Sequence, residues 1–541
     1  MSASHKKQLR KEQNAAQMTE KQREAQAEAK KLRLYTAAFA VVLALLVVFA
    51  AFSGVTKSGI VERGTTAVTV DGAKISAVEL NYYYIDSINQ YLEQWGDYVV
   101  LTGLDTGKAL DEQFVDSEQE TSWADYFLQQ ATNNIHTVYA IYNQAVADGY
   151  TLSEEDATSI DSNLATTELY AMYYYGYSDL DSYLVAMYGA GANEETYRAY
   201  AEVQYIASAY ANDHYDTLSY TAEEIAAVLA ENPNNYTSYD YNYYYVAAND
   251  FLMGGTEGEN GTITYSDEEK AAAVQAAKEA AEGLLEKNIT SAVLLDKAVK
   301  ELKDTAVSTA VVNKLYTSVS SIMQEWVSDA SRVAGDLGVI PYETTTTDAD
   351  GNETKTVNGY YVVLFNGAND NTYKLNNVRH LLVSFTGGTK DENGTTTYSD
   401  EEKAVAKSEA ENLLAQYLAG EQTEEAFAAL VDEKTDDTGS KGTGGLYENI
   451  HLGSSYVENF LNWANDESRK AGETGIVETE YGYHIMYFVG ESEESYRDSL
   501  ITTELRDKAM TEWEDGLIDG ATITVKNTGK VRTDLKLSSG K

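Results

Sequence analysis

The chain has 541 residues, which is too long for one ordinary domain and corresponds to roughly three or four domains. Its hydrophobic share of 43% and its 43 tyrosines provide enough apolar area to build real cores, which excludes a largely disordered protein. The net charge of −46 disfavours binding to nucleic acid. The complete absence of cysteine excludes disulfides, thiol catalysis and a lipidated cysteine anchor.

The N-terminal part of the chain is predicted to be a membrane anchor. Residues 1–33 form a basic segment, with nine lysines and arginines against four glutamates. Residues 34–56 follow without any charge and are long enough to cross a hydrocarbon layer of about 30 Å as a helix. The positive-inside rule then predicts a cytoplasmic N-terminus and a chain that lies outside the cell after this helix. A cleaved signal peptide is the alternative, but the basic region is too long for one and no A-x-A cleavage site follows.

Residues 65–235 are predicted to form a mainly helical domain. Its first part, Ala67–Glu79, indicates a strand, an Asp-Gly turn and a helix N-cap. The rest shows apolar residues at helical spacing and little strand signal. The tyrosine clusters Tyr82–Tyr84 and Tyr173–Tyr175 are interpreted as packing residues of these helices, with a peptide-binding surface as the alternative.

An internal repeat lies in the second half of the chain. The heptapeptide TYSDEEK occurs at Thr264–Lys270 and again at Thr397–Lys403, and in both copies its Ser and the Glu three residues later predict a helix capping box. A second shared string, W-x-x-D-x-S-R-x-A-G-x-x-G, begins at Trp326 and at Trp463. Two shared strings in the same order indicate a duplicated domain.

The duplicated domains are placed at residues 236–369 and 374–492. Each is predicted to run strand, long helix, irregular loop, short helix, strand, an α+β pattern in which the first and last strands pair. Residues 493–541 are predicted to form one helix, beginning at Ser495, and a short β-like run at Ala521–Val525. Because this helix is too isolated to be stable alone, we expect it to pack on the helical domain.

Three stretches of the second copy resemble the parvulin family of peptidyl-prolyl isomerases. They are VRHLLV at Val378–Val383, DDTGSKGTGGLYENI at Asp436–Ile450 and TEYGYHIMYF at Thr479–Phe488. The layout of the whole chain resembles the extracytoplasmic foldases of the PrsA and SurA type. The resemblance implies an α+β chain with an N-terminal transmembrane helix, a helical chaperone-like domain, two tandem parvulin-like domains and a C-terminal helix that returns to the helical domain.

The same resemblance implies which residues form the active site. They are His380, Asp437 and His484 for catalysis, and Phe460, Tyr456 and Tyr481 for substrate binding. Rotation about a peptide bond has a barrier near 18–20 kcal/mol but breaks no covalent bond. A catalyst therefore needs neither metal nor cofactor, only a pocket that favours the twisted amide over the planar one.

The first copy lacks these residues. An alignment on the phenylalanine that follows the first strand of each copy places Val246 opposite His380. The closing strands place Tyr361 opposite His484, and the glycine-rich loop of the second copy has no counterpart. The first copy is therefore predicted to be inactive and kept for spacing or for binding unfolded chains.

Together these patterns predict a membrane-anchored extracytoplasmic isomerase and foldase. Its partners would be unfolded or newly exported polypeptides with X-Pro bonds and, through one N-terminal helix, the cell membrane; no nucleic acid is expected. An exported chain without disulfides favours a Gram-positive-type bacterium. The alternatives are a non-catalytic holdase chaperone or a peptide-binding surface protein such as an adhesin. The sequence leaves the clients and the oligomeric state open.

Overall fold

A computed structural model describes residues 59–537, apart from 117, 119, 258–259, 348–350, 392–393 and 534. The basic segment 1–33 and the predicted transmembrane helix 34–56 lie outside the described residues. Among the helices of the described part, none combines the length and the apolar character that crossing a membrane requires.

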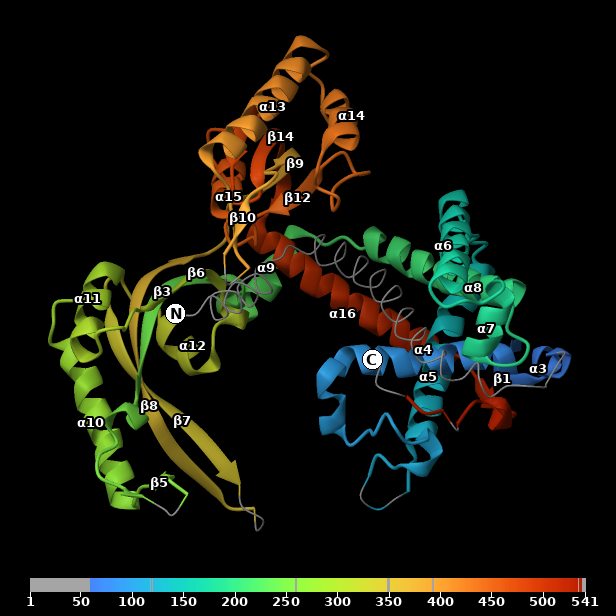
Figure 1. The fold of residues 1–541 in the computed structure, drawn as a ribbon, viewed down its shortest axis with the longest axis horizontal. Helices are drawn as coiled ribbons and strands as arrows, with labels where there is room; N and C mark the ends of the chain where they lie inside the picture. Colours follow the sequence, from blue (N-terminus) through green and yellow to red (C-terminus); the bar gives the residue numbers. More distant parts are fainter. Residues whose placement is uncertain are drawn as a thin grey trace. The chain divides into compact units, whose positions relative to one another are not determined.

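The described chain is a mixed α+β structure that divides into two compact units (Figure 1). One unit comprises residues 221–503 and contains the repeat. The other combines residues 59–220 with residues 504–537 and is mainly helical.

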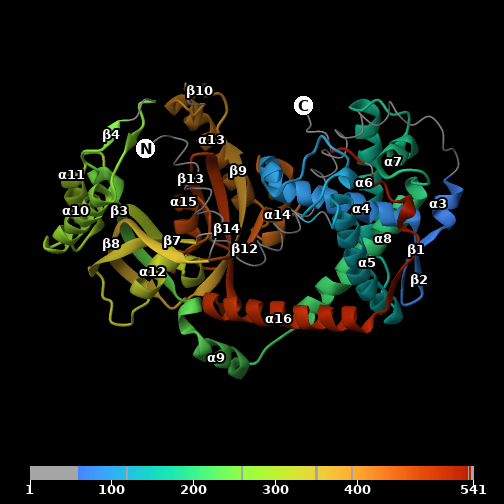
Figure 2. The same cartoon turned by 90° about the horizontal axis from the view of Figure 1, so that it is seen from below.

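The helical unit is built around three long helices that lie side by side (Figure 2). These are α4 (Ala77–Trp95), α5 (Trp123–Ala147) and α8 (Glu194–Thr217). The other elements of this part are α3 (Ile60–Gly64), α6 (Glu154–Tyr173), α7 (Leu180–Tyr188), β1 (Thr66–Val70) and β2 (Ala73–Ser76). Ser76 caps α4 as the sequence predicted, since its side chain accepts a hydrogen bond from the backbone of Glu79.

Tyrosines fill much of the helical core. Tyr82 and Tyr84 are completely buried, and the ring of Tyr82 meets that of Tyr188 edge-on at 4.7 Å. The packing interpretation is therefore confirmed for the first tyrosine cluster. In the second cluster it is wrong for Tyr173 and Tyr174, which are 79% and 75% exposed at the end of α6, but it holds for Tyr175, which packs against the same core.

The C-terminal segment belongs to the helical unit from residue 504 onward. Helix α16 (Tyr496–Gly520) leads to β15 (Ile523–Val525), which pairs with β1 in a three-stranded sheet. On α16, the indole of Trp513 stacks on the ring of His214 with centroids 4.4 Å apart. The predicted return of this helix to the helical part is confirmed.

The first copy of the repeat is a four-stranded antiparallel sheet covered by helices. Its strands follow the order β6-β3-β8-β7. Helices α10 and α11 pack on one face of the sheet and α12 on the other (Figure 1). The elements are α9 (Ala222–Glu231), β3 (Ser238–Ala247), β4 (Thr256–Glu257), β5 (Ile263–Thr264), α10 (Asp267–Leu285), α11 (Ala292–Leu302), β6 (Thr309–Leu315), α12 (Ser321–Val327), β7 (Leu337–Thr347) and β8 (Glu353–Asn369).

The second copy repeats this topology, with the strand order β12-β9-β14-β13. Its first and last long strands, β9 and β14, pair as predicted, and so do β3 and β8 in the first copy. The elements are β9 (Lys374–Ser384), β10 (Thr389–Lys390), β11 (Thr396–Thr397), α13 (Asp400–Ala419), α14 (Glu424–Lys434), β12 (Leu446–Ile450), α15 (Glu458–Ala464), β13 (Thr474–Glu478) and β14 (Gly482–Ser495).

The two repeated strings have structural roles. Both TYSDEEK strings form capping boxes, at Ser266 and at Ser399. In the second string, the tryptophan indole lies against the last glycine, so a Cβ on Gly338 or Gly475 would come within 2.3 or 2.6 Å of it. The arginine of the same string lies over the indole, which fixes the corner before the next strand.

Candidate active site

Two histidines lie together on one face of the second sheet. His380 is on β9 and His484 is on β14. The antiparallel register pairs His380 with Met486 and Leu382 with His484. Because alternate residues of a strand share a face, the two histidines are diagonal neighbours on the same face. The opposite face, which carries Leu381, packs against α13 and α14.

A chain of hydrogen bonds runs through both rings. Nε2 of His484 lies 2.9 Å from Oγ1 of Thr479, and its Nδ1 lies 3.0 Å from Nδ1 of His380. Nε2 of His380 in turn lies 3.0 Å from Oδ2 of Asp437. One arrangement of protons satisfies every bond of the chain: Thr479 donates to His484, His484 donates to His380, and His380 donates to the carboxylate.

The loop after α14 holds Asp437 in place. Its Oδ2 accepts hydrogen bonds from the hydroxyls of Ser440 and Tyr447, and its Oδ1 accepts one from the backbone of Gly439. The loop returns to the sheet at Gly445, whose carbonyl accepts a hydrogen bond from the backbone N–H of His380. The carboxylate is therefore tied both to its own loop and to the strand that carries the histidine.

Aromatic rings form the wall beside the histidines. The ring of Phe460, on α15, meets those of His380 and His484 edge-on, with centroids 5.4 and 5.6 Å apart. Tyr456 lies 5.2 Å from Phe460 and 5.4 Å from Tyr447. The site thus has a polar floor and an apolar wall of aromatic rings.

Burial and hydrogen bonding set the protonation states of His484, Asp437 and Tyr447. Burial lowers the pKa of His484 to about 3, and repulsion from His380 acts in the same direction. The hydrogen bond from His380 holds the pKa of Asp437 well below its usual range. Burial raises the pKa of Tyr447 above its usual value. At neutral pH, His484 is therefore neutral, Asp437 is ionised and the Tyr447 phenol keeps its proton.

Comparison with known proteins matches this region to one family. Residues 361–491 match the family described as PPIC-type PPIASE domain, and this segment contains the whole histidine site. The chain carries a parvulin-type peptidyl-prolyl cis–trans isomerase domain. No curated protein matches the chain.

Solved structures similar to this chain include several PrsA proteins at low identity. PrsA from Bacillus subtilis is 13% identical over 79% of this chain and 98% of its own, with a TM-score of 0.27. The foldase protein PrsA from Streptococcus pneumoniae is 11% identical over 75% and 89%, with a TM-score of 0.20. The peptidylprolyl isomerase PrsA from Bacillus anthracis is 20% identical over 28% of this chain and 59% of its own, with a TM-score of 0.17. Such TM-scores do not establish a shared arrangement of domains.

The parvulin domain brings most of the predicted site residues together. His380, Asp437 and His484 form one hydrogen-bonded cluster, and Phe460 contacts both histidine rings. Tyr456 lies one step further away, against Phe460. The structure gives the positions of these residues. Their roles in catalysis and substrate binding stay predictions.

Tyr481 does not join the cluster. Its side chain is 57% exposed at the rim, and its backbone carbonyl accepts a hydrogen bond from Phe385. The sequence-based reasoning missed two members of the cluster, Thr479 and Tyr447. Thr479 opens the quoted TEYGYH stretch five residues before His484, and Tyr447 follows the paired glycines of the loop. Thr479 and Tyr447 both lie inside the quoted motifs. Only the structure shows that Thr479 bonds to His484 and that Tyr447 bonds to Asp437.

The first copy has tyrosines where the parvulin domain has histidines. The sequence alignment placed Val246 opposite His380, and the strand register shows that this is wrong. Ala247 pairs with Gly359 in the first copy, just as Ser384 pairs with Gly482 in the second, so Ala247 and Ser384 are equivalent positions. His380 lies four residues before Ser384, and the residue four before Ala247 is Tyr243. Tyr243 is therefore the counterpart of His380.

An inserted turn explains the misalignment. Residues 248–251 form a 3-10 turn between β3 and the following Gly-Gly pair, and the second copy has no such turn at this point. The same register supports the other assignment, since it places Tyr361 at the position of His484. Val246 lies on the opposite face of the sheet, in the core under α10.

Proposed function

We propose that the second copy catalyses cis–trans isomerisation of X-Pro bonds in unfolded polypeptides, with His380, Asp437 and His484 as site residues. One observation carries the proposal: the bonded chain Thr479–His484–His380–Asp437 forms the floor of a pocket walled by Phe460, inside a segment that matches the isomerase family.

The pocket suits a reaction that breaks no bond. The planar amide owes its stability to charge separation between oxygen and nitrogen, which an apolar surround such as the Phe460 wall disfavours. The hydrogen-bonded histidine rings and the fixed Asp437 carboxylate provide oriented polar groups beside the twisting bond, and no proton has to be transferred. Thr479 and Tyr447 are positioning residues, since they hold His484 and Asp437.

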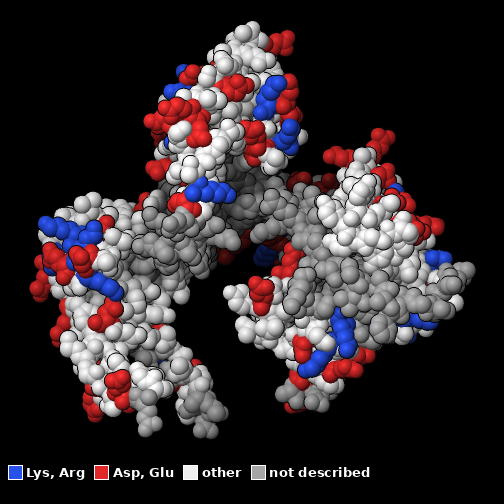
Figure 3. Space-filling model, viewed as in Figure 1, with Lys and Arg blue, Asp and Glu red and all other residues white. Residues whose placement is uncertain are grey.

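We further propose that the chain is a foldase anchored at the outer face of a cell membrane. In this proposal residues 34–56 form the anchor, residues 65–235 with 493–541 form a chaperone-like domain, residues 236–369 are a non-catalytic parvulin-like copy and residues 374–492 are the isomerase. The net charge of −46 supports a soluble surface exposed to client chains rather than to nucleic acid. Acidic side chains are spread over the described surface of the parvulin domain in Figure 3.

The test is a fluorescence assay of cis-to-trans conversion in an X-Pro tetrapeptide by the full chain. We expect acceleration over buffer, and we expect His380→Ala to lower kcat/KM by roughly 10–100-fold because it breaks the bonded chain at its centre. The control is His214→Ala, which removes a histidine of the helical unit. If the unmodified chain is no faster than buffer, the isomerase proposal fails and the non-catalytic holdase takes its place.

A further inference from the structure

A single cleft of about 1300 Å³ is lined by both copies of the repeat. The second copy contributes His380, His484 and Phe460, and the first contributes Tyr243 and Tyr361. The residues that replace the two histidines in the first copy thus face the same space as the histidines themselves.

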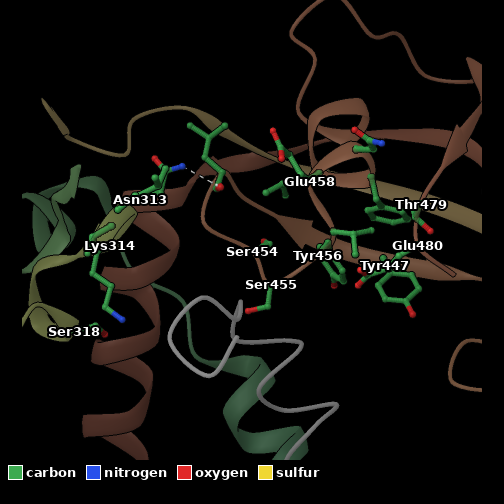
Figure 4. Close-up of a pocket in the computed structure, with 18 of the residues that line it drawn as sticks. Asn313, Lys314, Ser318, Tyr447, Ser454, Ser455, Tyr456, Glu458, Thr479 and Glu480 are labelled. Carbon is green, nitrogen blue, oxygen red and sulfur yellow. Dashed lines mark hydrogen bonds between the residues drawn. The ribbon is translucent and has the colours of Figure 1, made fainter. Parts of the chain in front are cut away.

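Contacts between the copies hold the two walls together. The side-chain amide of Asn313, on β6, donates a hydrogen bond of 3.1 Å to the carbonyl of Leu452 (Figure 4). The linker residue Asn371 is 1% exposed, and its amide donates to the carbonyl of Tyr236 and to the hydroxyl of Ser238. The first bond joins the two copies directly, and the bonds of Asn371 tie the linker to the first copy.

The wall of the first copy offers apolar ring surface. The ring of Tyr243 meets that of Tyr361 edge-on at 5.7 Å, and Tyr245 lies 4.9 Å from Tyr361. Met323 occupies the place that Phe460 has in the second copy, three residues before the shared tryptophan. Such a surface suits apolar side chains of a peptide, but it lacks the two histidines that form the floor of the second copy.

The same wall carries a positive charge. Lys314 lines the cleft beside Ser318, across from Tyr447, Tyr456 and Thr479 (Figure 4). Burial lowers its pKa, and among the described carboxylates none forms an ion pair with it. The Lys314 ammonium group is therefore available to pair with an acidic side chain, while the carboxylates of Asp437, Glu458 and Glu480 line other parts of the cleft.

The cleft is larger than one proline site requires. Pockets for small ligands span roughly 300–1,000 Å³, and an X-Pro dipeptide is a small ligand. The lining of this one cleft includes both the wall of the first copy and the histidine site.

We propose that the two copies form one substrate cleft, in which the first copy binds the residues that flank the X-Pro bond held at the second copy. The occupant is an extended client segment with an apolar side chain against Tyr243 and Tyr361 and an acidic one at Lys314. The inference rests on the proposed isomerase function of the second copy. It assigns the tyrosine copy a role in recognising long substrates.

The experiment compares two substrates of the full chain. One is an X-Pro tetrapeptide, and the other is the same core extended at both ends by leucine and glutamate to ten residues. We expect kcat/KM to be about ten-fold higher for the long peptide, mainly through KM, which corresponds to roughly 1.4 kcal/mol of added binding. Tyr361→Ala and Lys314→Ala should each reduce this ratio by about three-fold or more.

Tyr342→Ala is the matched control. Tyr342 contacts Tyr361 in the same cluster but does not line the cleft, so its removal should leave the ratio unchanged. If Tyr361→Ala unfolds the first copy, Lys314→Ala still tests the proposal, because Lys314 is not part of the hydrophobic core. The proposal of a shared cleft is overturned if kcat/KM is the same for both peptides in the unmodified chain. It is also overturned if Lys314→Ala leaves the ratio of the two kcat/KM values unchanged.

Failure of the proposed function gives a different result. If neither peptide is isomerised, the catalytic proposal fails, and the cleft is then tested by fluorescence anisotropy of the labelled long peptide. Binding that Lys314→Ala weakens supports the cleft, and absence of binding overturns it.

Discussion

His484 uses both of its ring nitrogens inside the protein. One lies 2.9 Å from the hydroxyl of Thr479 and the other lies 3.0 Å from His380, while the side chain is 6% exposed. A second ring proton on Nε2 would be donated to the hydroxyl of Thr479, inside the protein and away from water. The cost of charging a buried ring therefore appears as a pKa lowered to about 3.

This lowered pKa predicts how stability depends on pH. An unfolded histidine binds a proton near pH 6.5, whereas His484 in the folded protein does so only near pH 3. Between these values the unfolded state binds more protons, so the free energy of unfolding falls as the pH falls from about 6.5. At pH 5 the loss from His484 amounts to about 2 kcal/mol, measurable by urea unfolding of the full chain at pH 7 and pH 5.

The variant His484→Gln isolates this contribution. Glutamine keeps polar groups at the site but does not titrate, so the variant should lose about 2 kcal/mol less than the unmodified chain between the two pH values. Carboxylates outside the hydrogen-bonded cluster titrate equally in both proteins and cancel in the comparison. If both proteins lose the same free energy of unfolding between pH 7 and pH 5, His484 has a pKa near the usual value of a histidine.

At the scale of elements, the glycine-rich loop decides where Asp437 lies. Gly445 has a φ of +71°, and a Cβ there would come 2.2 Å from the carbonyl oxygen of His380. We expect Gly445→Ala to separate the loop from β9, to move Asp437 away from His380 and to lower kcat/KM on an X-Pro tetrapeptide by roughly ten-fold or more.

The matched variant for this loop is Gly442→Ala. Gly442 also has a positive φ, +94°, but nothing lies within 4 Å of its added Cβ. It therefore carries the backbone penalty of about 1 kcal/mol without the clash. If both variants lose activity equally, backbone strain is the cause, and the contact between Gly445 and the strand has no special role.

The sequence predicted helices and strands better than it predicted which residues of the two copies are equivalent. The capping boxes at Ser266 and Ser399 depend on neighbours three residues apart, so they could be predicted from local spacing. The equivalence of Tyr243 and His380 depends on strand pairing across more than a hundred residues, and the short turn after β3 concealed it. The bond between Thr479 and His484 was likewise invisible, because it follows from how the chain turns before β14.

At the scale of the whole chain, the helical unit depends on residues from both ends of the described sequence. Strand β15 pairs with β1, so that Val68 lies opposite Val525. Beyond β15, Leu535 and Leu537 are buried in the same core as Trp123. The sequence predicted that the tail would return, since an isolated helix is marginal, but the tail's apolar residues are too widely spaced to reveal which of them enter the core.

This arrangement predicts unequal effects of two substitutions in the tail. Leu537 is 3% exposed, so Leu537→Ala should remove packed methyl groups and leave a cavity that costs about 3 kcal/mol. Val525 is 44% exposed, so Val525→Ala should change the free energy of unfolding by only about 0.5 kcal/mol. Urea unfolding of the full chain, followed by tryptophan fluorescence, measures both. Since Trp123 and Trp513 lie in the helical unit, loss of this unit changes the signal directly. Equal and small effects would mean that the tail only lies on the surface, and the helical unit would then be complete without it.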